Sequence, residues 1–144
     1  MNQGSLYSAL ASGGLLPFFA TALASVLGIA QIPGLGAPAE LLNSYGLVIV
    51  CFLAGVHWAT AIYHEDKALR KLLVVSNAVL LTVWIAYATG PLSISLLAQV
   101  IALIVLLAID FWIKNSGLIA MNYWHVRVVA TMLASVSILV VLLR

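Results

Sequence analysis

Three ionisable side chains, His57, Asp110 and Arg127, interrupt long apolar stretches of this chain. A charge inside a bilayer costs about 2.5–3.5 kcal/mol on insertion scales, so such residues usually pair with one another and mark helix contacts, ligand sites or ion paths. A carboxylate that meets a guanidinium and an imidazole can form a salt bridge, bind a polar head group or pass a proton. These three residues are therefore the first candidates for chemistry.

The chain that carries them has the composition of a membrane protein. Of its 144 residues, 65% are hydrophobic and 7% are charged, whereas a soluble domain has about 25% charged residues. A helix needs about 20 apolar residues to cross hydrocarbon. Uncharged runs predict spans near 5–31, 41–63, 69–88, 91–113 and 120–142. The predicted fold is all-α, a bundle of five transmembrane helices that forms one domain over residues 1–144.

Proline and glycine residues separate the predicted spans. The segment "IPGLGAPAE" follows the first span, and "TGP" at 89–91 divides the 38 uncharged residues from 72 to 109. Both patterns are typical of turns, because proline and glycine stop helices. Pro17, inside the first span, predicts a kink there.

The three ionisable residues lie at a similar depth in these spans. His57 is about 9 Å inside the end of the second span at 1.5 Å per residue. Asp110 is one turn before the end of the fourth span, and Arg127 is about one and a half turns into the fifth. We therefore predict that Asp110 and Arg127 form a salt bridge with His57 beside it. In the alternative, Arg127 extends to the head groups and Asp110 reaches water or Lys114.

Aromatic residues flank this group, so the candidate polar cluster or ligand site comprises His57, Trp58, Asp110, Trp124 and Arg127. An interfacial aromatic belt accounts for the tryptophans, and a bound quinone or lipid head group is the alternative. As a structural cluster, the residues would hold three helices together.

Haem and metal cofactors are disfavoured by the positions of the possible ligands. His57 and His125 could ligate haem only if they faced one cavity, and His125 is about 200° from Arg127 around its helix. Cys51 is the single cysteine, and no Cys/His spacing of a metal site is present. No catalytic residue and no metal site are predicted.

The positions of the basic residues predict the orientation of the chain in the membrane. Lys67, Arg70 and Lys71 follow the second span at helical spacing and are expected to contact lipid head groups, or else a soluble partner. Together with Lys114 they share a side with the N-terminus, whereas the opposite side has only Arg144. The positive-inside rule then puts the N-terminus in the cytoplasm and the C-terminus outside. Because no signal or transit peptide is evident, we expect a bacterial inner membrane.

The sequence lacks the motifs of soluble enzymes, including G-x-S-x-G, H-E-x-x-H, the P-loop and the Rossmann fingerprint. Its six basic and four acidic side chains are too scattered for a nucleic-acid surface. The sequence does not exclude an enzymatic function, but no motif supports one. The leading expectation is a non-enzymatic accessory protein that binds membrane lipid and other membrane subunits. The alternatives are a quinone- or lipid-binding protein and a proton or small-solute channel or carrier.

Four segments resemble a known family. They are "GLLPFFATAL" (14–23), "YGLVIVCFLAGVHWATAI" (45–62), Asp110 and "YWHVRVVATML" (123–133). Together they are similar to the transmembrane protein 69 family, a group of unknown function (DUF3429), over residues 14 to 143.

The resemblance implies that certain residues match recurring family positions: Pro17, Gly55, His57, Trp58, Asp110 and Arg127. Ala54 and Ala59 stand where the family tends to have glycine, and "NYWHVR" departs from its usual start of the fifth helix. The resemblance establishes no activity, but it favours an accessory or assembly role in an energy-transducing membrane.

Overall fold

Five α-helices make up most of the chain in the structure, a computed structural model that describes residues 3–64 and 68–144. The helices are α1 (Gln3–Val26), α2 (Pro38–His64), α3 (Arg70–Thr89), α4 (Leu92–Asn115) and α5 (Met121–Leu142). All five are long and apolar enough to cross a membrane. The predicted all-α bundle of five transmembrane helices is therefore confirmed.

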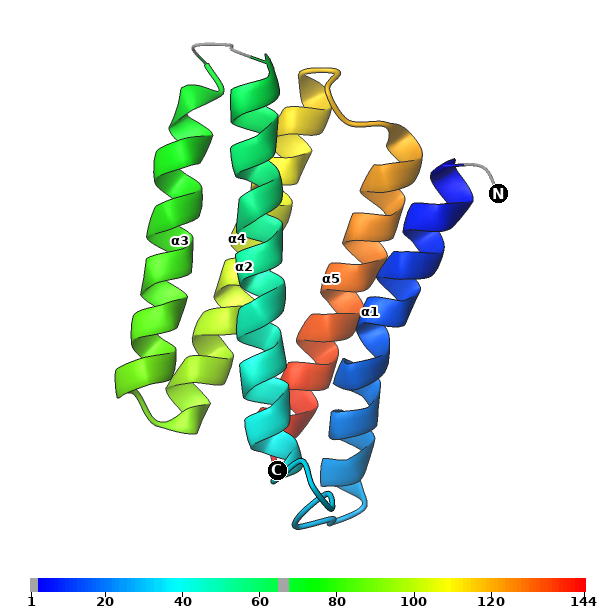
Figure 1. The fold of residues 1–144 in the computed structure, drawn as a ribbon, viewed down its shortest axis with the longest axis vertical. Coiled ribbons are helices and arrows are strands. Elements are labelled where there is room, and N and C mark those ends of the chain that lie inside the picture. Colours follow the sequence, from blue (N-terminus) through cyan, green and yellow to red (C-terminus); the bar gives the residue numbers. More distant parts are fainter. Residues whose placement is uncertain (1–2, 65–67) are drawn as a thin grey trace.

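Successive helices run antiparallel, and α2 and α4 lie between the other three (Figure 1). Helix α3 packs on α2 and α4, whereas α5 packs on α4 and α1, and α1 also contacts α2. The last helix therefore lies beside the first.

The two ends of the bundle differ in their charged residues. The end of α2, the start of α3 and the 116–120 loop lie at one end, with the start of α1 beside them (Figure 1). We call this the basic end, because Arg70, Lys71 and Lys114 lie there; Lys67 falls outside the described residues. The opposite end, with the 27–37 loop and the turn at Gly90, is called the far end.

The first helix ends earlier than its apolar sequence predicts. The expected span reached residue 31, but α1 stops at Val26 because Gly28 adopts a left-handed conformation with φ of 71°. The N–H of Gly28 donates to Ser25 O at 3.1 Å, and the N–H of Ile29 donates to Ala24 O at 3.0 Å. This pair of bonds is a Schellman cap, which satisfies the last carbonyls of the helix. Pro17 lies within α1, which continues through it.

Apolar side chains form a main core and a smaller cluster near the basic end. The main core joins α1, α2, α4 and α5 through large buried residues such as Phe18, Leu42, Leu103, Leu106 and Ile138. The smaller cluster consists of Ala61, Leu69, Leu72 and Ile113, and it closes the basic end between α2, α3 and α4. The candidate site lies between the two clusters.

Candidate functional site

His57, Asp110 and Arg127 meet in the bundle interior, and we call them the triad. Asp110 Oδ1 lies 2.8 Å from His57 Nε2, and Arg127 Nε donates to Asp110 Oδ2 at 2.6 Å. The three side chains come from α2, α4 and α5. All are buried, with relative exposures of 1% for His57, 2% for Asp110 and 7% for Arg127. The triad therefore joins three helices through one carboxylate.

The charges within the triad balance. An ionised carboxylate only accepts hydrogen bonds, so His57 Nε2 carries the proton that it shares with Asp110. With a neutral imidazole, the negative Asp110 and the positive Arg127 cancel, which lowers the cost of burying them. Arg127 is not extended to the head groups, and Asp110 is not paired with Lys114; that alternative is wrong.

The triad leaves part of its bonding capacity unused. Arg127 bonds through Nε alone rather than through a two-pronged contact, and its Nη2 is buried without a partner. His57 Nδ1 is likewise buried and unpartnered. Each Asp110 oxygen accepts one of the bonds described, although a carboxylate can accept about four. The triad can therefore bond to a further group.

Trp58 and Trp124 do not join the triad. Trp58 follows His57 by one residue, which turns it about 100° around α2, and it is 41% exposed. Trp124 instead packs against Phe111, with ring centroids 5.5 Å apart. Lys114 Nζ lies 5.3 Å from the Trp124 ring centroid and 5.5 Å from that of Phe111. Here the aromatic rings hold a cation at the basic end, outside the triad.

A pocket of about 230 Å³ reaches Asp110 from the basic end, and we call it the Asp110 pocket. Its walls come from α2, α4, the start of α5 and the loop before it. The lining residues are Val56, Thr60, Asp110, Leu118, Ile119, Ala120 and Tyr123. Most of this wall is apolar, and Asp110 is its charged group. The pocket thus offers a hydrogen-bond acceptor within apolar surroundings.

A second polar cluster, which the sequence analysis missed, lies towards the far end. Ser95 Oγ donates to Asn43 Oδ1 at 2.7 Å, and Gln99 Nε2 donates to Asn43 Oδ1 at 2.7 Å and to Asn43 O at 2.8 Å. All three residues are buried. Gly46 makes room for them, because a Cβ at that position would lie 2.0 Å from Gln99 Oε1. These bonds link α2 to α4 at a second level of the bundle.

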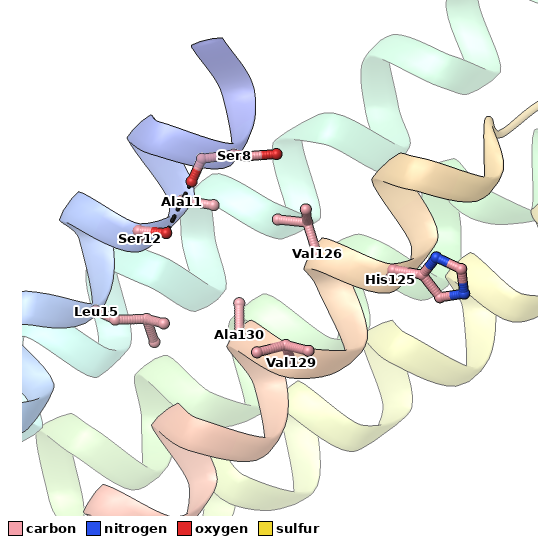
Figure 2. Close-up of a pocket in the computed structure, with 8 residues that line it drawn as sticks. All are labelled: Ser8, Ala11, Ser12, Leu15, His125, Val126, Val129 and Ala130. Atoms are coloured by element: carbon pink, nitrogen blue, oxygen red, sulfur yellow. Dashed lines mark hydrogen bonds between the residues drawn. The ribbon is translucent and has the colours of Figure 1, made fainter. Parts of the chain in front are cut away.

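His125 faces a different part of the molecule from the triad. It lines a pocket of about 220 Å³ between α1 and α5, together with Ser8, Ala11, Ser12, Leu15, Val126, Val129 and Ala130. Figure 2 shows its imidazole turned away from the serines of α1. His57 and His125 therefore do not face one cavity in which they could hold a haem. Among the described residues, no three His, Cys, Asp or Glu side chains gather as metal ligands.

The basic residues predicted to contact lipid lie at the bundle surface. Arg70 and Lys71 begin α3 and are exposed at the basic end. Their spacing and exposure suit contact with head groups, which stays a prediction. Lys67, the third member of that prediction, falls outside the described residues.

Comparison with known proteins gives one family and no individual relative. Neither the curated proteins nor the solved structures contain a match to this chain. The specific likeness to transmembrane protein 69 stays a prediction. The matched family extends over residues 5–143, which includes the triad and all five helices apart from the first two residues of α1. The chain belongs to the family described as "Protein of unknown function (DUF3429)".

Proposed function

We propose that this protein binds the head group of a lipid-soluble molecule in the Asp110 pocket. The observation that carries the proposal is the approach of this pocket to a buried carboxylate whose oxygens have unused acceptor capacity. The ligand class is an apolar molecule whose head donates a hydrogen bond. A quinol, through its hydroxyl, and an amine-headed phospholipid, through its ammonium, both fit this chemistry.

The surroundings of Asp110 define what the ligand must provide. Because Arg127 already neutralises the carboxylate, the pocket has no net charge with which to attract an anion. A donor group is therefore favoured over a free phosphate. The apolar wall of Val56, Leu118 and Ile119 suits a ring or the first carbons of a chain.

The size of the pocket limits the bound part to a head group. Pockets that enclose a drug-sized molecule measure about 300–1,000 Å³, whereas this one measures about 230 Å³. A long hydrocarbon tail does not fit inside and would lie along the bundle in the membrane. The protein would then bind the head group of the ligand while the tail of the ligand stays in the bilayer.

Filling the pocket tests the proposal. In the Thr60→Phe variant, an aromatic ring occupies the pocket, and we expect the bound ligand to fall at least about tenfold, a loss of roughly 1.4 kcal/mol. The measurement is solvent extraction of detergent-purified protein, with quinones and phospholipids quantified per chain by mass spectrometry. A retained quinone would identify the ligand as a quinol, and a retained amine-headed phospholipid would identify it as that lipid.

The matched control is Thr82→Phe. Like Thr60, Thr82 donates to the carbonyl one turn back, at 2.8 Å to Ala78 O, but it lies on the exposed side of α3. Its replacement should leave the bound ligand unchanged. Equal ligand content in the wild type and the Thr60→Phe variant, or no ligand in the wild type, would reject the proposal.

A second candidate function is that of an accessory subunit in an energy-transducing membrane, and α3 favours it. Only Leu72, Ser76 and Val83 of this helix are buried, so most of its apolar side chains face outward. A partner helix could pack there. A membrane subunit that co-purifies at fixed stoichiometry, and that is lost when Trp84 on the outer face is changed to Ala, would support this function; its retention would count against it.

We also propose that the protein lies in a bacterial inner membrane with its N-terminus in the cytoplasm and its C-terminus outside. Arg70, Lys71 and Lys114 at the basic end, against Arg144 at the other, support this orientation by the positive-inside rule. A reporter that is active only outside the cytoplasm should work when fused after Arg144 and fail when fused after Asn115. The reverse pattern would overturn the orientation.

A further inference from the structure

Asn77 places a side-chain amide within the span of α3 and leaves part of its hydrogen-bonding capacity unused. Its Nδ2 donates to Leu73 O at 2.7 Å. A carbonyl only accepts hydrogen bonds, so the atom that faces Leu73 O is the amide nitrogen and not Oδ1. Within residues 3–64 and 68–144, no group donates to Asn77 Oδ1. The oxygen and the second N–H proton of this side chain are therefore available to another partner.

This amide lies at a depth where the membrane offers it no partner. Asn77 is seven residues after the start of α3, about 10 Å along the helix at 1.5 Å per residue, and its side chain is partly exposed. Hydrocarbon supplies no water, so an unsatisfied polar group there costs free energy. The amides of Asn43 and Gln99 avoid this cost by bonding to each other inside the bundle. Asn77 can avoid it through a partner outside the bundle.

Exposed residues on the same side of α3 continue from Asn77 as a row. They stand alternately three and four residues apart, which is the heptad spacing by which two helices pack side by side. We call this set the Asn77 row: Val74, Asn77, Leu81, Trp84 and Ala88. All but the partly exposed Asn77 are exposed. Because α3 lies at the edge of the bundle (Figure 1) and is the least buried of the five spans, the row is open to the membrane.

We propose that two copies of this protein pair in the membrane through the Asn77 row, with their Asn77 side chains bonded to each other. Copies with the same orientation hold Asn77 at the same depth, so a twofold axis along the membrane normal brings the two amides together. Each Nδ2 then donates its second proton to the Oδ1 of the other copy, which satisfies both unused groups. A single asparagine in an apolar heptad row is also known to fix register and oligomeric state.

The other members of the row supply the rest of the contact. Leu81 and Trp84 would pack against their counterparts, and Ala88 is small enough to let the two helices approach closely at the far end. Arg70, one heptad before Asn77, lies at the basic end, where its long side chain can extend to the head groups so that the two guanidinium groups do not meet. The inference goes beyond ligand binding and does not depend on it, because the described wall of the Asp110 pocket includes no residue of α3.

Removing the amide tests the pairing. Purified protein carrying a donor or an acceptor dye on a tag after Arg144 is mixed in phosphatidylcholine liposomes, and energy transfer is followed as the protein is diluted with lipid. The Asn77→Val variant should dissociate at a protein density at least about tenfold higher than the wild type, a loss of roughly 1.4 kcal/mol. The Asn77→Gln variant keeps an amide and should retain most of the pairing. Thermal unfolding in detergent is recorded for each variant, and Asn77→Val should not lower the stability of the monomer, because it removes a polar group from a surface that faces lipid.

The matched control is Thr82→Val, which also removes an exposed polar group from α3. Thr82 is five residues from Asn77 and therefore about 140° away around the helix, so this variant should pair as the wild type does. Cysteine cross-linking locates the contact independently. With Cys51 changed to Ala, oxidation should cross-link two copies of the Leu81→Cys variant and not two copies of the Val75→Cys variant, because Val75 lies about 120° from Leu81 around α3.

Three results would overturn the inference. They are a wild type that stays monomeric at every protein density, an Asn77→Val variant that pairs as the wild type does, and cross-linking of the Val75→Cys variant in place of the Leu81→Cys variant. A monomer that instead binds a different membrane subunit through Trp84 would reject self-pairing and support the accessory function. The ligand content of the Asp110 pocket is unaffected by any of these results, so the pairing and the ligand proposal fail separately.

Discussion

The Arg127→Leu variant should lose about 3–5 kcal/mol of stability, because removing one member of a buried ion pair leaves the other charge uncompensated. Arg127 is the cation that bonds to Asp110, and both are buried within the bundle. Adding Asp110→Asn should restore much of the loss. An asparagine carries no charge, and its side-chain carbonyl can still accept the bond from His57 Nε2. Thermal unfolding in detergent measures both effects.

The test asks whether the stability losses of the Arg127→Leu and Asp110→Asn variants add up in the double variant. Arg70→Leu removes an exposed arginine of the same length and should change stability by no more than about 0.5 kcal/mol. If the double variant is as unstable as the two single variants combined, Asp110 and Arg127 are not energetically coupled despite their contact.

The Gly46→Ala variant should be destabilised by about 2 kcal/mol, even though alanine is the better helix former. The added methyl would lie 2.0 Å from Gln99 Oε1 and 3.0 Å from its Cδ, so the side chain must move. That movement breaks the bonds of Gln99 Nε2 to Asn43 in a fully buried place. Leaving such groups unsatisfied costs about 1–3 kcal/mol, which outweighs the gain of about 0.5–1 kcal/mol from replacing a helical glycine.

The sign of this effect should reverse when Gln99 is absent. In a Gln99→Ala background the three atoms nearest to the methyl are gone, so Gly46→Ala should be neutral or stabilising by up to about 1 kcal/mol. Gly55→Ala on the same helix has no atom within 4 Å of the added methyl and serves as the control. Loss of stability on Gly46→Ala in both backgrounds would place the cause outside the contact with Gln99.

Much of the fold follows from the sequence because hydrocarbon allows few structures. Uncharged length and the Gly90–Pro91 break are enough to predict α3 and α4 closely. The predicted end of α1 was wrong because the uncharged run continues to residue 31, whereas the backbone turns at Gly28. Hydropathy reports which residues tolerate lipid, and it does not report where a left-handed glycine ends a helix.

The meeting of the triad residues follows from depth reasoning, since each residue lies a known distance from a helix end. The same reasoning could have found the second cluster: Asn43 is five residues into α2, and Ser95 and Gln99 are three and seven residues into α4 from the same end. These residues are neutral, so the cost of burying a charge gave no reason to predict that they pair. Which way Trp58 and Trp124 point depends on helix rotation, which hydropathy does not fix.

The contact between Asp110 and Arg127 also constrains the order in which the protein is made. A ribosome adds roughly 5–20 residues per second, so the 17 positions between them take about a second or longer to translate. During that interval Asp110 has His57 of the second segment as a partner but lacks its cation, and a carboxylate without a cation is costly to move into hydrocarbon. Helix α1 likewise lacks its packing contact with α5 until the last segment has been made. A nascent chain halted before residue 127 should therefore remain at the translocon, and its final segment completes both contacts at once.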